Sequence, residues 1–327
     1  MKLVLTGGCG FIGHHVVEHI LRNTDWQIVI LDKLSYASSG FQRLRDIAAF
    51  DSSRVSLFAV DFAAPLSPGV LQEIGDVDCI VHMGAETDVD RSITDPEQFV
   101  RTNVLGTFHM LEFARRQPKL KWFVYFSTDE VFGPAPGHVA YQEWDRYDSR
   151  NPYAATKAAG EELALAWANT YGVPLFVTHT MNVFGERQHR NKFIPKVMNF
   201  IAAGDIVPIH ADPTGTISGS RFWIHARNVA SALCFLLEHA APREKYNIVG
   251  EREVSNYEMA RFVADVMGAE LQCQFVDFHS SRPGHDLRYA LDGSRMAALG
   301  WALPLTFEQS LRKTIEWTLH HPRWLHE

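Results

Sequence analysis

A glycine-rich segment near the start of the chain, between an apolar run and an amphipathic pattern, restricts the fold more than any other feature. Leu3-Val4-Leu5 predicts a buried strand, and Ile12, Val16 and Ile20 recur at the spacing of one helix face. Residues 6–13 between them contain G-x-G-x-x-G, whose glycines allow a tight turn and bring backbone amides close to a pyrophosphate. The sequence therefore predicts a strand–loop–helix unit that binds a dinucleotide.

A carboxylate at the end of the second expected strand indicates which dinucleotide. The apolar run 27–31 is followed by Asp32, which can accept hydrogen bonds from both adenosine ribose hydroxyls and would repel a 2′-phosphate. We therefore expect NAD rather than NADP, although Lys33 next to Asp32 weakens this discrimination against NADP.

Apolar runs continue to alternate with helical patterns through the first half of the chain. Strands are expected at residues 55–60, 79–83, 122–126 and 173–178, and a helix at 96–116. This alternation predicts an α/β fold with a doubly wound parallel sheet. From residue 182 the regular repeat stops, which suggests a cofactor domain at 1–181 and a smaller C-terminal α/β substrate domain at 182–327. A strand at 246–249 is expected to bring about 222–250 back to the first domain. Helices are expected at 193–203, 255–267 and 307–319.

Charge, cysteine and histidine content limit the possible partners. The net charge of −7, with no basic run, argues against a nucleic-acid partner. The chain begins directly with a strand and contains no apolar run of membrane-spanning length, so we expect no membrane partner and a cytoplasmic location. The cysteines have no metal or redox spacing, and His14 and His15 are expected at the helix surface or in packing. We therefore expect reduced thiols and no metal.

The strongest candidates for catalytic residues follow the run 122–126. Thr128, Asp129 and Glu130 come where that strand should end, and Asn151-Pro152 predicts the start of a helix. Four residues separate Tyr153 from Lys157, so the two share one face of this helix. Ligands of open α/β sheets bind beyond the carboxyl ends of the strands. We therefore expect a phenol, an ammonium and two carboxylates in one cleft.

These segments resemble the extended short-chain dehydrogenase/reductase superfamily over essentially the whole chain, and most closely its dTDP-glucose 4,6-dehydratase family. The glycine loop and Tyr153-x-x-x-Lys157 indicate only the superfamily. Residues 31–37, 85–93, 127–133 and 282–290 are similar to the dehydratase family in particular. The resemblance implies a Rossmann sheet, NAD as cofactor, a nucleoside-diphosphate sugar as substrate and a homodimer. A small-residue face at Ala154, Ala155, Ala158 and Ala159 permits close packing against the sheet or against a partner.

The resemblance also implies a reaction and a role for each candidate. Tyr153 as phenolate would remove the proton of the sugar 4-hydroxyl while NAD takes the hydride from C4. Lys157 would lower the pKa of Tyr153 and bind the nicotinamide ribose, and Thr128 would hydrogen-bond near the 4-hydroxyl. Glu130 would then remove the C5 proton, Asp129 would protonate the departing 6-hydroxyl, and the hydride would return to C6.

The remaining implied contacts fall into two sets. The expected cofactor-binding residues are Gly7, Gly10, Phe11, Ile12, Gly13, Asp32, Lys33, Asp61, Phe62, Met83, Gly84, Ala85, Asn103, Ser127, Tyr153 and Lys157. The expected substrate-binding residues are Thr87, Asn182, Lys192, Arg221, Arg282 and His285.

The sequence departs from the dehydratase pattern at several substrate-facing positions. Asp88 replaces a usual histidine, Asn191 replaces a glutamate, and residues 186–190 and the surroundings of Arg221 also differ. The nucleotide base and the C2 substituent, hydroxyl or acetamido, therefore stay open. A 4-epimerase or decarboxylase of the same fold is the main alternative, and a non-catalytic NAD-sensing protein is a remote one. The Asp129–Glu130 pair favours the dehydratase, because simple oxidation or epimerisation has no use for it.

Overall fold

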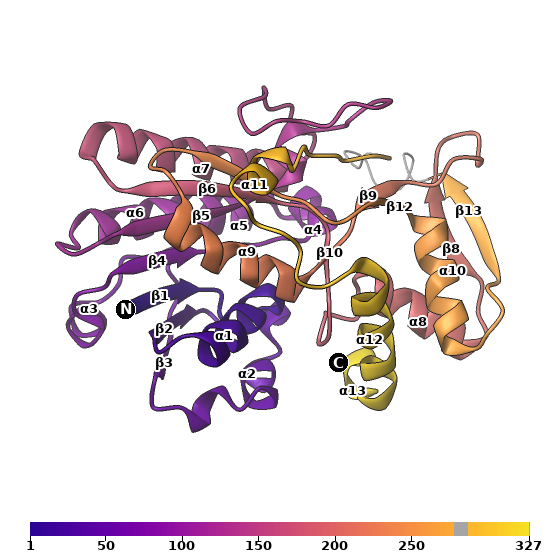
Figure 1. Cartoon of the computed structure of the whole chain (residues 1–327), viewed down its shortest axis with the longest axis horizontal. Coiled ribbons are helices and arrows are strands. Elements are labelled where there is room, and N and C mark those ends of the chain that lie inside the picture. Colours follow the sequence, from indigo (N-terminus) through magenta and orange to yellow (C-terminus); the bar gives the residue numbers. More distant parts are fainter. Residues whose placement is uncertain (278–286, 327) are drawn as a thin grey trace.

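A seven-stranded parallel sheet organises the molecule, for which a computed structural model describes residues 1–277 and 287–326 (Figure 1). The strand order is β11-β6-β5-β4-β1-β2-β3. The strands are β1 (Lys2–Thr6), β2 (Gln27–Asp32), β3 (Val55–Ala59), β4 (Cys79–His82), β5 (Trp122–Thr128), β6 (Leu175–Thr180) and β11 (Lys245–Ile248). The chain proceeds from β1 through β2 to β3 and then crosses to β4 on the other side of β1, which confirms the doubly wound topology. The switch between β1 and β4 is where such sheets bind ligands.

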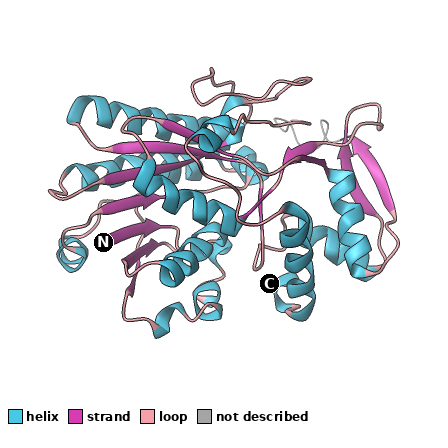
Figure 2. Cartoon of the chain, viewed as in Figure 1, coloured by secondary structure: helices cyan, strands magenta, loops and turns pink. Residues whose placement is uncertain are grey.

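Helices pack on both faces of the sheet, which explains why its strands are apolar without alternation (Figure 2). Leu3 and Leu5 of β1 belong to the core shared with α1 (Phe11–Asn23) and α9 (Ala226–His239). Val4 points to the opposite face and shares a core with α3 (Pro68–Ile74), α6 (Gly106–Arg115) and α7 (Pro152–Tyr171). Two layers of helices thus hold the sheet rigid and leave the ends of its strands for the site.

A second, smaller core lies beyond the ends toward which the strands run, on the right in Figure 1. It is built from α8 (Phe193–Ala203), α10 (Asn256–Met267), α12 (Phe307–His320) and β8 (Val207–Ala211), which pairs in parallel with β13 (Cys273–Asp277). Two short pairs connect it to the main body: β7 (Val183–Phe184) with β10 (Ile224–His225), and β9 (Ser220–Phe222) with β12 (Glu253–Ser255). The space between the two cores is therefore bordered by the strand ends on one side.

The short remaining elements are α2 (Gln42–Asp46), α4 (Val89–Thr94), α11 (Ser294–Ala298) and α13 (Arg323–His326), with single turns η1 (Tyr36–Ser38), η2 (Ala49–Asp51) and η4 (Asp129–Phe132). The helix expected at 255–267 begins with a capping box, since the Ser255 hydroxyl accepts from the Glu258 amide and the Glu258 carboxylate accepts from the Ser255 amide. The sixth strand begins and ends two residues later than expected. His14 and His15 are both fully buried, so they serve packing rather than the surface.

The stretch expected as one helix at 96–116 is helical throughout 96–115, but it consists of three segments rather than one uniform α-helix. They are α5 (Pro96–Phe99), a π-helical segment η3 (Val100–Leu105), and α6. Within η3, the carbonyl oxygen of Asn103 accepts from the Thr107 hydroxyl, and the Asn103 side chain binds the backbone of Glu86 at both its N–H and its carbonyl. These contacts to a neighbouring loop accompany the wider turn, and hydrophobic periodicity carries no signal for them.

At residues 1–277 and 287–326, no helix combines the length and the apolar composition that crossing a bilayer requires.

Candidate active site

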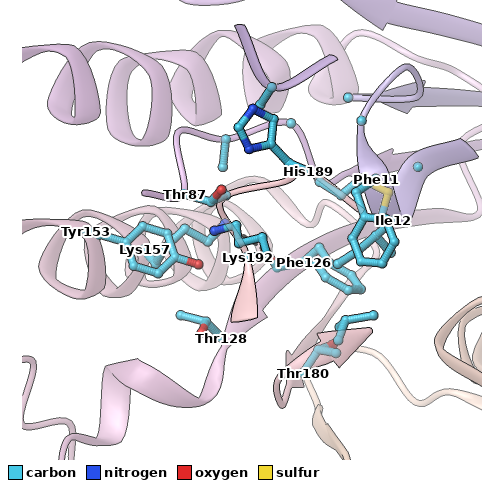
Figure 3. A pocket seen from close by; sticks show the side chains of 18 of the residues that line it. Phe11, Ile12, Thr87, Phe126, Thr128, Tyr153, Lys157, Thr180, His189 and Lys192 are labelled. Carbon is cyan, nitrogen blue, oxygen red and sulfur yellow. Dashed lines mark hydrogen bonds between the residues drawn. The ribbon is translucent and has the colours of Figure 1, made fainter. Parts of the chain in front are cut away.

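A cavity of about 340 Å³ lies at the carboxyl ends of β1, β2, β4, β5 and β6. Figure 3 shows Tyr153 and Lys157 at one end of this space, with Phe11 and Ile12 at the other. The lining residues that the sequence predicted are Gly7, Gly10, Phe11, Ile12, Gly13, Asp32, Lys33, Phe62, Met83, Gly84, Ala85, Thr87, Ser127, Thr128, Asp129, Glu130, Tyr153, Lys157, Asn182 and Lys192. The structure thus brings all five candidate catalytic residues to one cavity.

The glycine loop is shaped to leave room for a ligand backbone. Gly7 has a φ of +74°, and a Cβ added at Gly13 would lie 2.2 Å from the Gly7 carbonyl oxygen. Asp32 fixes the loop from the next strand, because its carboxylate accepts from the Cys9 amide at 2.9 Å and the Leu34 amide at 2.8 Å. The α1 N-terminus and this loop therefore form a cradle that only glycine permits, as dinucleotide binding requires.

Thr128 connects the candidate redox group to the acidic pair. As the last residue of β5, it caps the following turn η4 by accepting from the Glu130 amide. Its hydroxyl donates to Asp129 Oδ1 at 3.0 Å and is also hydrogen-bonded to the Tyr153 phenol. One hydroxyl therefore contacts both Tyr153 and Asp129.

The α7 helix presents Tyr153 and Lys157 because its start is fixed. The Asn151 side chain accepts from the Ala154 amide at 2.8 Å, and Pro152 follows at the first helical position, as predicted. Burial, followed by the Glu130 charge and the Asp129 charge, holds the pKa of Tyr153 above its ordinary value. Burial lowers the pKa of Lys157 to about 7.

The expected lowering of the Tyr153 pKa by Lys157 is not seen in this structure. The Lys157 ammonium instead donates to the Phe126 carbonyl oxygen at 2.7 Å and lies over the Tyr125 ring. Hydrogen bonding to Thr128 is what favours the phenolate form of Tyr153 here.

The two neighbouring carboxyl groups are tuned to hold a proton near neutral pH. Burial raises the pKa of Asp129 to about 6, against the opposing charge of Arg221. Burial and then the Asp129 charge raise the pKa of Glu130 to about 7, while the Asn151 hydrogen bond, Arg221 and Lys192 lower it. Asp129 Oδ2 is buried and has no hydrogen-bond partner among the described residues. The pair can therefore offer one acid and one base at the same place.

This tuning predicts that Asp129→Asn stabilises the protein at neutral pH. The pKa of Asp129 is higher in the folded chain than its ordinary 3.8, so the folded state binds the proton more tightly. Stability is then lost as the pH rises through the window from about 4 to about 6. We expect Asp129→Asn to gain on the order of 2 kcal/mol at pH 7.5. Thermal unfolding should show this gain shrinking toward zero near pH 4, and a less stable variant at pH 7.5 would contradict it.

Three predicted site residues do not line the cavity. Asp61 is exposed and accepts from the Ala63 amide. Asn103 is buried, and its side chain joins the Glu86 backbone to Thr156 on α7. Arg221 donates to the Ser220 and Leu287 carbonyl oxygens and packs over the Tyr289 ring, although its charge acts on both acidic residues. Arg282 and His285 lie outside the described residues.

Sequence reasoning missed part of the lining. These residues are Ser35, Ala37, Ser38, Thr102, Phe126, Thr180, Met181, Val183, Gln188, His189, Phe193 and Trp223. Thr180 could have been found, because it stands beside Thr128 at the end of the adjacent parallel strand. Gln188, His189 and Trp223 carried no such signal, since their place depends on how the smaller core packs against the sheet. No cluster of His, Cys, Asp and Glu suited to a metal occurs within residues 1–277 and 287–326.

Comparison with known proteins agrees with this geometry. A sequence model of the GDP-mannose 4,6-dehydratase family matches residues 4–314. The chain belongs to this family. The family lies in the extended short-chain dehydrogenase/reductase superfamily, as the sequence motifs indicated.

Individual relatives span nearly the whole chain. A dTDP-glucose 4,6-dehydratase of Escherichia coli is 34% identical, with 99% of this chain and 95% of the relative covered. The crystal structure of a dTDP-glucose 4,6-dehydratase from Streptomyces venezuelae, with NAD bound, has a TM-score of 0.89 and 32% identity, covering 99% of this chain and 98% of the other. A UDP-glucose 4-epimerase of Thermus thermophilus in complex with NAD has a TM-score of 0.85 and 25% identity, covering 97% and 98%. Since an epimerase also has this fold, the reaction must be argued from the site.

Proposed function

We propose that the protein is an NAD-dependent nucleoside-diphosphate-hexose 4,6-dehydratase, a hydro-lyase that forms a 4-keto-6-deoxy sugar. The observation that carries this proposal is the Asp129–Glu130 pair, which lines the same cavity as Tyr153 and Lys157. A 4-epimerase needs to move a proton only at the 4-hydroxyl. The carboxyl groups of Asp129 and Glu130, whose pKa values are raised toward neutrality, are needed only if a second proton transfer follows.

The residues at the glycine-loop end of the cavity fit NAD. The cradle of Gly7 and Gly13 would hold the pyrophosphate, and the Asp32 carboxylate is placed to accept from the adenosine ribose hydroxyls. When bound, NAD supplies the acceptor for the C4 hydride and the donor that returns it to C6. This end of the cavity would therefore bind the cofactor that accepts and returns the hydride.

The protein's own groups perform the proton transfers. Tyr153 accepts the proton of the sugar 4-hydroxyl, assisted by the Thr128 hydroxyl. The resulting 4-ketone acidifies the C5 hydrogen, which Glu130 removes as a base. Asp129, protonated, gives its proton to the 6-hydroxyl as it leaves as water. When the hydride returns to C6, Glu130 gives its proton back to C5, and the 4-hydroxyl proton taken by Tyr153 replaces the one that Asp129 lost, so each group returns to its starting state.

Substrate contacts are proposed at the opposite side of the cavity. Lys192, at the N-cap of α8, and Asn182 line it, and the Lys192 ammonium suits a diphosphate oxygen. Thr87 lines the cavity from the loop after β4. We propose dTDP-glucose as the first substrate to test, by analogy with the relatives.

The experiment that tests the reaction is product analysis over several nucleotide sugars. The protein should be incubated with NAD and, separately, with dTDP-glucose, UDP-glucose, GDP-mannose and UDP-N-acetylglucosamine, and the products examined by mass spectrometry. A product lighter by one water is expected from at least one of them. A product of unchanged mass would indicate an epimerase, loss of CO₂ from the corresponding uronic acid a decarboxylase, and no turnover a binding protein.

We also propose that the protein is a cytoplasmic homodimer. Ala154 is fully buried against its own chain, whereas Ala155 and Ala159 on α7 are exposed, as are Val100 and Leu105 of η3. These apolar side chains lie on adjacent helical segments and would pair with the same segments of a second copy. Cysteines present as free thiols suit a reducing compartment. Light scattering should give twice the chain mass.

A further inference from the structure

The start of α7 is joined to the acidic pair through one side chain, Asn151. This residue is 6% exposed and precedes Tyr153 by two positions. Its Oδ1 accepts from the Ala154 amide at 2.8 Å, and its Nδ2 donates to Glu130 Oε2 at 3.1 Å. The two ends of one amide thus contact the helix that carries the redox residues and the carboxylate that would act at C5.

The orientation of the Asn151 amide follows from chemistry. A backbone N–H can only donate, so the atom facing Ala154 must be the oxygen. The NH₂ group then necessarily faces Glu130, and it can bind the carboxylate as an acceptor. A serine at this position could cap the helix equally well but has no second polar atom to reach the carboxylate. Capping alone therefore does not account for asparagine.

We propose that Asn151 is a positioning residue that holds the Glu130 carboxylate toward the cavity and keeps it in its basic form. The inference rests on the proposed function, because it assigns Glu130 the role of the C5 base. Asn151 thereby couples the geometry of the elimination step to the helix that presents Tyr153.

The charged surroundings of Glu130 support this role. Asp129 from η4 raises its pKa, whereas Arg221 from β9 and Lys192 at the start of α8 lower it. Among the causes that lower it, the hydrogen bond from Asn151 is the largest. The Tyr153 phenol responds to the same carboxylate, since the Glu130 charge raises its pKa. A neutral donor at 151 can therefore favour the carboxylate without adding a charge that would act on Tyr153.

Variants of Asn151 separate the donor from the cap. Asn151→Ser keeps a capping oxygen and loses the donor, Asn151→Asp keeps the cap and places a negative charge against Glu130, and Asn151→Ala loses both. Ser255→Ala removes a helix cap on α10, away from the cavity, and serves as the matched control. We expect thermal stability to fall in Asn151→Ala and Ser255→Ala and to change little in Asn151→Ser.

The decisive readout is the pH dependence of dehydration. Glu130 must be ionised to act, so removing its donor should move the acid limb of the kcat profile upward, by about one pH unit in Asn151→Ser and further in Asn151→Asp. Dehydration below the limb should then fall about tenfold in Asn151→Ser. Ser255→Ala should keep the wild-type limb. If the acid limbs of the kcat profiles coincided for Asn151→Ser, Asn151→Asp and the wild type, the proposal would be overturned.

A second measurement keeps this test independent of the assigned reaction. In protein labelled with carbon-13 at the glutamate carboxyl, the Glu130 resonance is identified by its absence in Glu130→Gln and followed through a pH titration without substrate. Its midpoint should rise in Asn151→Ser. An unchanged midpoint would refute the role of Asn151. A raised midpoint in a protein that dehydrates no nucleotide sugar would contradict the proposed function but would still support the effect of Asn151 on Glu130.

Discussion

Glu130→Gln should stop water elimination while leaving the first oxidation intact. Glutamine has nearly the same shape and can still accept the hydrogen bond from Asn151, but it cannot take the C5 proton. We expect formation of the dehydrated product to fall about 10³-fold, the range that loss of a general base gives. Because Tyr153 and Lys157 are untouched, the hydride is still removed from C4. Reduced nicotinamide should therefore accumulate and be visible by its absorbance in a single turnover.

The matched control for this change is Glu162→Gln, an exposed glutamate on α7 that does not line the cavity. It should retain wild-type kcat and show no accumulated reduced nicotinamide. If Glu130→Gln formed the dehydrated product at the wild-type rate, Glu130 would not be the C5 base, and the case for a dehydratase would lose its main support.

Tyr153→Phe should block the reaction one step earlier. Phenylalanine fills the same buried space but removes the hydroxyl that contacts Thr128 and accepts the 4-hydroxyl proton. We expect a loss of about 10³-fold in dehydration, again the range of acid–base catalysis. In contrast to Glu130→Gln, no reduced nicotinamide should appear, because oxidation at C4 itself fails.

Tyr171→Phe, a change at the exposed end of the same helix, provides the control. It should leave both kcat and nicotinamide absorbance as in wild type. The two active-site variants therefore make opposite predictions for one optical signal. Accumulation of reduced nicotinamide in Tyr153→Phe would place Tyr153 outside the oxidation step.

The parts of the fold that the sequence predicts well are those determined by local chemistry. The glycine loop, the carboxylate of Asp32 and the Asn151-Pro152 helix start all follow from backbone geometry over a few residues. The doubly wound sheet follows from the alternation of apolar strands with helices. In each case the controlling interactions are near in sequence, so a pattern can carry them.

The features that the sequence does not predict depend on contacts between distant segments. Asn103 on η3 joins the loop after β4 to α7, which helical periodicity cannot foresee. Arg221 acts on the acidic pair by its charge while its side chain lies against Tyr289, a placement that depends on the pairing of β9 with β12. Lys157 on α7 donates to the carbonyl oxygen of Phe126 on β5, a contact between two elements that are distant in sequence. The sequence could single out these residues, but it could not predict which groups they contact.

The most direct test of the account follows one hydrogen atom through the reaction. With a nucleotide sugar that the protein accepts, labelled with deuterium at C4, the account predicts a product lighter by one water that carries the deuterium at C6. This outcome requires oxidation, elimination and hydride return within one cavity. A product that keeps the deuterium at C4 with unchanged mass, or an oxidised sugar that leaves its deuterium on the nicotinamide, would contradict it.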